Sequence, residues 1–249
     1  MNDSIHVAYS ELVRASTEAV RGLGFPFGQA DDAAPTLVWL QAVLGAGYPS
    51  LRLADGTRPV AGWGQARLSK SDDFCAVDLT GLPLFVYGTR VSDLAVALAQ
   101  KANGARLLVR GALGGWAAQY IVSRVAAAGI DVMGTWQPGG NGADDAPAGS
   151  FVARGTRGSD PPGVYRRAFA DETPSPVVSF VSELSLTLNQ TSDKSARLDA
   201  PGEEISPDVL IERCIAVGMQ VPPEDHAFLG SLCARLRVRA SERSRNQAG

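Results

Sequence analysis

Apolar residues recur at intervals of three and four near both ends of the chain, which is the spacing of one face of a helix. The helices predicted from this pattern span residues 9–23, 29–44, 206–218 and 222–236. Ser206, Pro207 and Asp208 form a strong helix start, because they supply a cap, a proline at the first helical position and an acidic first turn. Pro35 lies inside the second stretch, so the pattern predicts a kink there or a helix that begins at Ala34.

Predicted strands alternate with predicted helices in the middle of the chain. Residues 82–87 form a near-continuous apolar run, which is typical of a strand buried on both faces. Ser92 is expected to cap the helix that follows. The other elements predicted here are strands at 74–79, 105–109 and 130–136 and helices at 93–103 and 115–128. Because strands joined through helices form right-handed crossovers, we expect parallel strands in this region.

The segments outside these repeats are less regular. Residues 48–73 are rich in turn formers, and we expect a loop or a short hairpin around Asp55-Gly56. Residues 179–188 alternate apolar and polar positions, which predicts a half-buried, antiparallel strand. The polar stretches 137–149 and 189–204 are expected to be loops.

Together these elements predict a single α/β domain over residues 1–249. We expect a mixed, partly parallel sheet flanked by helices, with an N-terminal helix pair and C-terminal helices. The expected parts are an N-terminal helical part over 1–47, an α/β core over 74–188, and C-terminal helices with a tail over 205–249.

Composition excludes several classes of protein. Hydrophobic residues make up 45% and charged residues 20% of the 249 residues, which is ordinary for a globular protein. The net charge of −3 argues against a general nucleic-acid binder, which usually carries a basic surface. No apolar run is long enough for a membrane span, and the N-terminus has no signal-peptide pattern. We therefore expect a cytoplasmic protein without membrane or nucleic-acid partners.

Cysteine and histidine are scarce. Cys75, Cys214 and Cys233 are widely separated, so they predict neither a disulfide framework nor a zinc site. The two histidines, His6 and His226, are too few and too far apart in sequence to indicate a catalytic triad or a metal site. No metal is predicted.

The most site-like feature is the glycine-rich turn over 111–116, between a predicted strand and a predicted helix. Backbone N–H groups at a helix N-terminus can hold a phosphate or a carboxylate, so Gly114, Gly115 and Trp116 are candidate ligand-binding residues. The turn matches neither the dinucleotide-binding glycine motif nor a Walker A loop. The alternative is an ordinary tight connection between a strand and a helix.

The C-terminal tail is a second candidate. Residues 238–249 are dense in Ser, Glu, Arg and Asn, as polar chain ends often are. The alternative is a segment folded over a pocket for an anionic ligand, because arginine offers a fork for carboxylates. On that hypothesis Ser244 and Arg245 bind the ligand, while Ser241, Glu242 and Asp32 are candidate catalytic residues.

Both ends of the chain also carry motifs of a known kind. Residues 28–33, Gly-Gln-Ala-Asp-Asp-Ala, precede Trp39-Leu40, and the tail contains Val238, Ala240-Ser-Glu242 and Ser244-Arg245. These stretches resemble an uncharacterised bacterial family, domain of unknown function 3726, which has Gly-Leu-Ala-Glu-Glu-Ala before Trp-Leu and ends in Val-Pro-Ala-Ser-Glu-x-Ser-Arg. Arg239 replaces the proline. The resemblance spans most of the chain and implies no established activity.

A second, more distant resemblance concerns the helix pair at the start and residues 91–128. Their order of helix, strand, Gly/aromatic turn and helix is similar to the malate/L-lactate dehydrogenase family that lacks a Rossmann domain. That family's Ser-His-Gly motif would fall near residues 47–51 and its second histidine near 113–116, and neither stretch contains histidine. The usual acid for hydride transfer is therefore missing.

Two functional hypotheses follow. The first is a small-molecule metabolic protein that acts on or binds an amino-acid-like or oxo-acid ligand, with a second copy of the chain as homodimer partner. The second is a non-catalytic accessory protein or a degenerate relative of a nicotinamide-dependent 2-oxo-acid reductase. No cofactor is predicted, and NAD(P) has no support from the sequence.

Overall fold

The computed structural model describes residues 5–59, 62–102, 104–138, 149–153, 155, 164–168, 180–190 and 203–236. The helices are α1 Tyr9–Gly22, α2 Phe27–Leu44, α3 Gly47–Gly56, α4 Leu84–Lys101, α5 Ala117–Ala127, α6 Pro207–Val217 and α7 Pro223–Ala234. The strands are β1 Ile5–Val7, β2 Arg67–Lys70, β3 Cys75–Asp78, β4 Ala105–Leu113, β5 Ile130–Pro138, β6 Gly149–Ala153, β7 Val164–Ala168, β8 Phe180–Gln190, β9 Glu203–Ile205 and β10 Met219–Val221.

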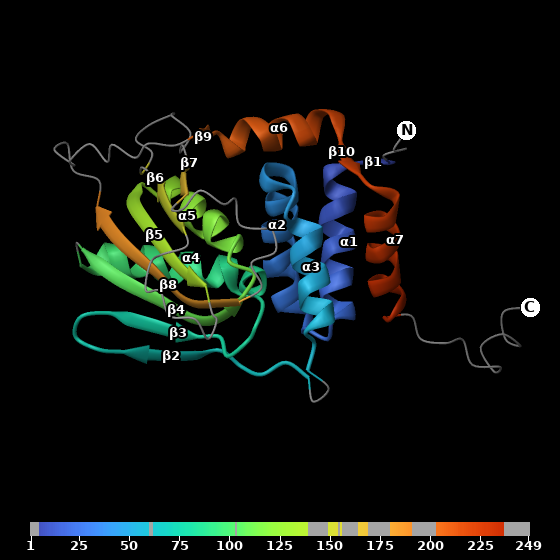
Figure 1. Ribbon diagram of the computed structural model, residues 1–249. Helices are drawn as coiled ribbons and strands as arrows, with labels where there is room; N and C mark the ends of the chain where they lie inside the picture. Colours follow the sequence, from blue (N-terminus) through green and yellow to red (C-terminus); the bar gives the residue numbers. More distant parts are fainter. Residues whose placement is uncertain are drawn as a thin grey trace, which may run out of the picture.

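A twisted sheet with two helices packs beside a group of helices from both ends of the chain (Figure 1). The sheet has the order β2-β3-β4-β8-β5-β6-β7-β9 among the described strands. Among the described strands of this sheet, β3 and β4 pair in parallel, and the other pairs are antiparallel. The predicted fold class, a mixed and partly parallel sheet flanked by helices, is confirmed.

The alternating strand predicted over 179–188 is confirmed as β8, and it lies between β4 and β5. Leu184, Leu186 and Leu188 are fully buried, whereas the residues between them are half-buried. Because β8 is antiparallel to both neighbours, β4 and β5 run in the same direction without pairing. The sequence pattern predicted their direction but not the inserted strand.

The predicted strand over 82–87 is wrong, because these residues begin helix α4. Leu84 is its first residue, and Pro83 before it has the extended backbone of a helix N-cap. Ser92 is therefore inside the helix, and its hydroxyl donates to the carbonyl of Gly88 at 2.7 Å. The first turn of α4 is buried on every side, and a short apolar run of that kind has the same pattern as a buried strand.

The loop or hairpin predicted around Asp55-Gly56 is also wrong, because residues 47–56 form α3. Tyr48, Leu51 and Ala54 are buried at helical spacing. Gly47 is needed at the start of α3, because an added Cβ would collide with the carbonyl of Leu37. The helix is thus defined by its packing against α2 rather than by local propensity.

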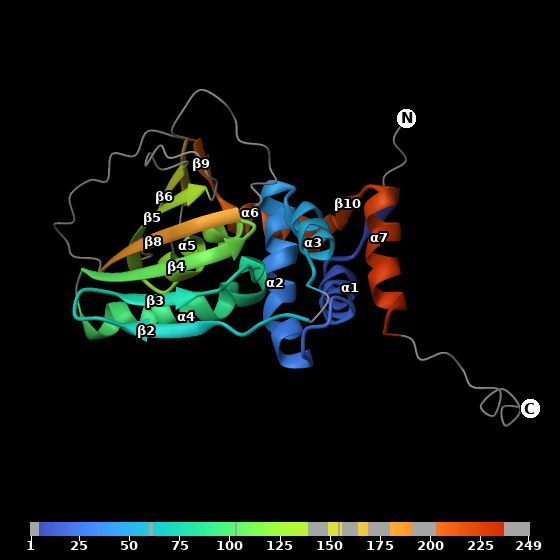
Figure 2. The same ribbon diagram turned by 60° about the horizontal axis from the view of Figure 1, so that its bottom comes forward.

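Helix α2 connects the two parts of the molecule (Figure 2). It packs on α1 and α3 on one side and on α4 and α5 on the other. The helix runs through Pro35 from Phe27, so the alternative start at Ala34 is wrong. Trp39 of α2 meets the ring of Tyr120 of α5 edge-on, with ring centroids 5.7 Å apart.

A small second sheet joins the two ends of the described chain. β1 pairs antiparallel with β10, from Ile5–Val221 to Val7–Met219. Gly218 permits this close approach, since an added Cβ would lie 3.0 Å from the carbonyl oxygen of Val7. Among the described helices, none has the length and hydropathy that crossing a membrane requires.

Candidate functional site

The glycine-rich turn is a tightly bonded connection between β4 and α5. Gly114 has a φ of +78°, which a glycine adopts without strain, and Trp116 is the N-cap of the helix. The N–H groups of Ala117 and Ala118 donate to the carbonyls of Gly114 and Gly115 at 3.3 and 2.9 Å. All three candidate residues of the turn are buried, with Trp116 only 7% exposed.

The chain that follows β3 holds the end of β4 in place. The N–H of Gly81 donates to the carbonyl of Gly111 at 2.6 Å, and the N–H of Leu113 donates to the carbonyl of Leu82 at 3.0 Å. Asp78 fixes the bend between β3 and Gly81, because its carboxylate accepts from both the N–H and the hydroxyl of Thr80. The turn is therefore positioned by two neighbouring strand ends.

Helix α3 reaches the turn through Ser50. An added Cβ at Gly114 would lie 4.0 Å from Ser50 Oγ, and the Ser50 hydroxyl donates to the carbonyl of Ala46 at 2.7 Å. The structure thus brings together the two stretches, 47–51 and 113–116, where the dehydrogenase resemblance would place its histidines. Sequence reasoning missed Ser50, because residues 48–73 were predicted to form a loop or a short hairpin.

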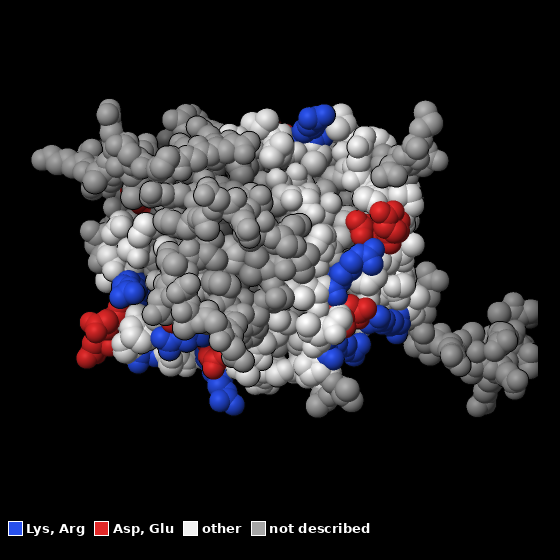
Figure 3. Space-filling model, in the orientation of Figure 1, with Lys and Arg blue, Asp and Glu red and all other residues white. Residues whose placement is uncertain are grey.

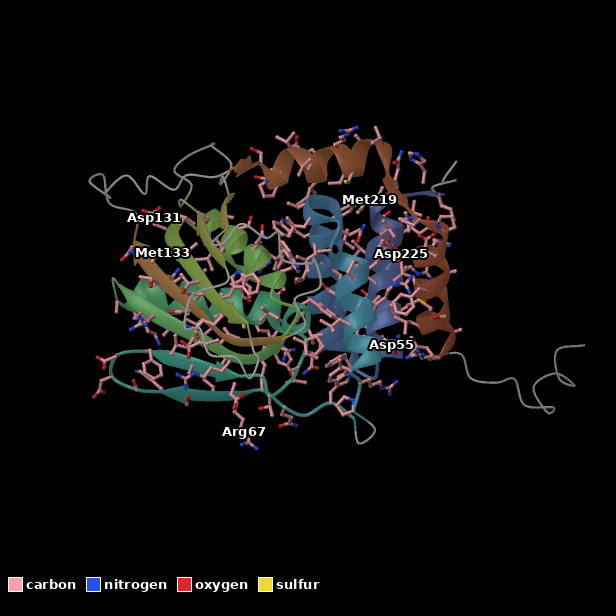
Figure 4. All side chains as sticks on the ribbon, viewed as in Figure 1. Asp55, Arg67, Asp131, Met133, Met219 and Asp225 are labelled. Carbon is pink, nitrogen blue, oxygen red and sulfur yellow. The ribbon has the colours of Figure 1, made fainter. Side chains whose placement is uncertain are left out.

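The opposite side of α3 faces α7 (Figure 4). Arg52 pairs with Asp225 at 2.8 Å, and Asp55 pairs with Arg235. Figure 3 shows such charges as alternating basic and acidic side chains over these helices. Tyr48 lies on the same side, where burial and then the charge of Asp225 raise its pKa well above the usual range. Tyr48 is therefore a poor proton donor near neutral pH.

Gln119 was not singled out from the sequence, although it is a polar residue in a mostly apolar helix. It lies on the first turn of α5 and is fully buried. Neither the oxygen nor the nitrogen of its amide has a hydrogen-bond partner among the described residues. An unpaired buried amide is costly, and such groups often mark a ligand site.

Asp32, a candidate catalytic residue, connects α2 to α4. Its carboxylate pairs with Arg90 at 3.0 Å, and its carbonyl accepts from the hydroxyl of Thr89 at 3.0 Å. Thr89 in turn lies 3.4 Å from the hydroxyl of Tyr120 on α5. These contacts give Asp32 a structural role at the helix interface, and its catalytic role stays a prediction.

The predicted site residues of the tail, Ser241, Glu242, Ser244 and Arg245, lie outside the described residues. Their convergence on the turn therefore stays a prediction. The last described helix, α7, packs on α1, and Arg235 at its end donates to both carboxylate oxygens of Asp55 at 2.6 and 3.0 Å.

The histidines belong to elements away from the turn. His6 is in β1 beside Gln220, and His226 is in the first turn of α7. Both elements lie on the helical side of the molecule, whereas β4 and α5 form part of the sheet layer (Figure 1). The described part of the chain holds no cluster of three or more His, Cys, Asp or Glu residues that could bind a metal.

Protein-family models give no match to the chain, and no curated protein matches it. Solved structures do match over nearly the whole length. Malate dehydrogenase from Entamoeba histolytica has a TM-score of 0.68 at 11% identity, and the match covers 95% of this chain and 99% of that one. Malate dehydrogenase from Pyrococcus horikoshii has a TM-score of 0.66 at 13% identity, covering 96% and 97%.

A reductase has the same architecture. The Δ1-piperideine-2-carboxylate reductase from Pseudomonas syringae has a TM-score of 0.64 at 13% identity, and the match covers 92% of this chain and 99% of that one. At such low identity the likeness concerns the fold alone. The chain therefore has the fold of these malate dehydrogenase-like proteins, as the more distant of the two resemblances implied.

Proposed function

We propose that this chain is a small-molecule metabolic protein that binds a carboxylate ligand, an oxo acid or an amino-acid-like compound, at the turn 114–116. Its fold is that of proteins named for malate and Δ1-piperideine-2-carboxylate, which are both carboxylates. Shared fold alone does not transfer a function, so the proposal depends on the geometry at the turn.

The observation that carries the proposal is the position of Ser50, whose Oγ lies 4.0 Å from where a Cβ on Gly114 would be, near the N-terminal end of α5. The positive end of a helix favours an anion, and the hydroxyl of Ser50 can turn from the neutral carbonyl of Ala46 to a carboxylate. Gly114, Gly115 and Trp116 would supply the turn, with Ser244 and Arg245 closing over it. Ser241, Glu242 and Asp32 are the proposed reacting groups.

No nicotinamide step is included in this proposal. Reduction of an oxo acid needs a proton donor, and the stretches 47–51 and 113–116 contain Tyr48 and Ser50 but no histidine. The raised pKa of Tyr48 makes its phenol a weak acid at neutral pH. These residues do not fit the hydride-transfer chemistry of a reductase.

The absence of histidine from the stretches 47–51 and 113–116 favours the second candidate. This candidate is a non-catalytic accessory protein or a degenerate relative of a 2-oxo-acid reductase. Assay of the purified chain with 2-oxo acids and NADH or NADPH decides between the two. Turnover by the isolated chain would rule out the non-catalytic candidate, whereas binding without turnover would support it.

The test of the site is a thermal-shift titration with 2-oxo, 2-hydroxy and 2-amino acids, in which a bound ligand raises Tm. We expect Ser50→Ala to weaken the binding of the best ligand roughly tenfold, because a hydrogen bond to a charged group is lost. Ser92→Ala is a matched control, since Ser92 is also a buried helical serine that donates to a carbonyl at 2.7 Å.

Two outcomes would contradict the proposal. One is equal binding by the Ser50→Ala and Ser92→Ala variants. The other is unchanged binding and turnover after deletion of residues 238–249, which would remove Ser244 and Arg245 from the site.

Membership of the uncharacterised bacterial family, a cytoplasmic location and a homodimeric state are also part of the proposal. The matching motifs at both ends of the chain support the first. The exposed apolar side chains of Val209 and Ile215 on α6 support the last.

A further inference from the structure

A cleft separate from the turn lies where both ends of the described chain meet. It has a volume of about 350 Å³, which is within the usual range for small-molecule sites. Its walls come from β1, the C-terminal half of α2, α6 and β10. Met219, which lines it, lies where the end of α6 turns toward α1 and α2 (Figure 4).

The polar lining of the cleft is rich in hydrogen-bond donors. It consists of His6, Gln41, Arg213 and Gln220, and none of the ten lining residues is acidic. The Gln41 amide oxygen accepts from the N–H of Tyr48 at 3.1 Å, which leaves its NH₂ group to donate. The lining therefore suits an anion.

Arg213 supplies the charge. The described residues provide no ion-pair partner for its guanidinium. Figure 3 shows a basic side chain over α6 with no acidic neighbour on that face. Burial raises the pKa of the Cys214 thiol, and the charge of Arg213 opposes that rise. An unpaired guanidinium fork fits a carboxylate.

The remaining walls are apolar, with Ala42, Leu210, Val217 and Met219 on three elements. Apolar walls around one cation favour an organic anion over inorganic phosphate. We propose that this cleft binds a small aliphatic carboxylate, with its carboxylate on Arg213 and its chain between α2 and α6. The site is distinct from the turn, because its residues come from β1, α2, α6 and β10 rather than from α3, β4 and α5.

Cys214 makes the location testable, since its thiol also lines the cleft. The probe is hexanoate, with hexanamide as its neutral analogue and inorganic phosphate as a second anion. Peptide mass spectrometry of the full chain would give the iodoacetamide alkylation rate of each cysteine. We expect saturating hexanoate to slow alkylation of Cys214 several-fold and to leave Cys233, outside the cleft, unchanged.

The variant Arg213→Gln removes the charge from an exposed position, so folding should be unaffected. We expect the hexanoate concentration for half-maximal protection to rise roughly tenfold in this variant. The matched control is Arg14→Gln, which changes an exposed helical arginine outside the cleft and should leave protection as in the wild type. For each variant, the alkylation rate of Cys214 is compared with and without hexanoate.

Four results would overturn the inference. They are absence of protection at Cys214, equal protection by hexanamide, equal protection by phosphate, and unchanged protection in Arg213→Gln. A carboxylate that shifts Tm and depends on Ser50 but leaves Cys214 unprotected binds at the turn and not here. Failure of one site is therefore distinguishable from failure of the other.

Discussion

Single buried polar groups distinguish this protein at the residue scale. Gln119 is fully buried with no hydrogen-bond partner for its amide among the described residues, whereas the buried hydroxyls of Ser50 and Ser92 are both paired. The hydroxyl of Thr36 is a second buried group without a described partner. Paired groups contribute to stability and unpaired ones reduce it.

We expect Gln119→Met to raise the free energy of unfolding by roughly 1–3 kcal/mol, because an apolar chain of similar length replaces an unsatisfied amide. Urea denaturation followed by circular dichroism would measure it. Ser92→Ala serves as the opposite case, since it removes a satisfied hydroxyl and should lower stability. A loss of stability in Gln119→Met would show that the amide has partners in solution.

Sequence reasoning at this scale identified positions but not their contacts. Gly114 and Trp116 were named from a glycine-rich turn, and the structure places Ser50 near Gly114. Asp32 was named as a candidate catalytic residue, and its carboxylate pairs with Arg90, 58 residues away. Such partners depend on the fold, so no local pattern could have shown them.

Close helix contacts dominate at the element scale. Gly22 ends α1, and an added Cβ there would collide with the carbonyl of Leu232 in α7. Gly28 lies in the first turn of α2 and has open space around its Cβ position. The close contact with α7 therefore requires a glycine at position 22, whereas packing does not require one at position 28.

This contrast gives a paired prediction. Gly22→Ala should lower the free energy of unfolding by roughly 1–3 kcal/mol, because the added methyl forces α1 and α7 apart. Gly28→Ala should raise it by up to about 1 kcal/mol through helix propensity. Thermal unfolding of both variants would measure the difference. Equal effects would mean that α7 does not pack this closely on α1.

Element boundaries show where local patterns fail. The stripes over 9–23 and 222–236 predicted α1 and α7 within a few residues, because α1 has one apolar and one polar face and α7 buries Leu229 and Leu232 at helical spacing. The run over 82–87 was assigned to a strand, because α4 is buried all round at its first turn and has no polar face there. Helix α3 was missed, since its glycines and proline resemble a loop.

At the scale of the whole molecule, helix α6 carries exposed apolar side chains on more than one side. Val209, Ile215 and Val217 of α6 are each at least 60% exposed, and Pro207 is the only described residue of α6 that is buried. The helix lies across the top of the molecule between its two parts (Figure 1). Exposed apolar side chains on one helix suit contact with another chain.

We expect the wild type to run as a homodimer in size-exclusion chromatography with light scattering, with α6 in the interface. Ile215→Glu should shift it to the monomer, because a charge would be buried in the contact. Leu68→Glu is the control, since Leu68 is equally exposed on β2. A monomeric wild type would contradict the dimer, and a dimer unaffected by Ile215→Glu would place it elsewhere.

The sequence by itself determined the fold class and the apolar faces of most elements, because periodicity and capping are local properties of the chain. It also indicated a resemblance to malate/L-lactate dehydrogenases, and the chain shares the fold of malate dehydrogenase structures. Tertiary structure decided the rest. It inserted β8 between β4 and β5, made 82–87 helical, and brought Ser50 to Gly114 and Arg213 to Gln41. These outcomes depend on burial and on contacts between residues far apart in sequence, which no local pattern encodes.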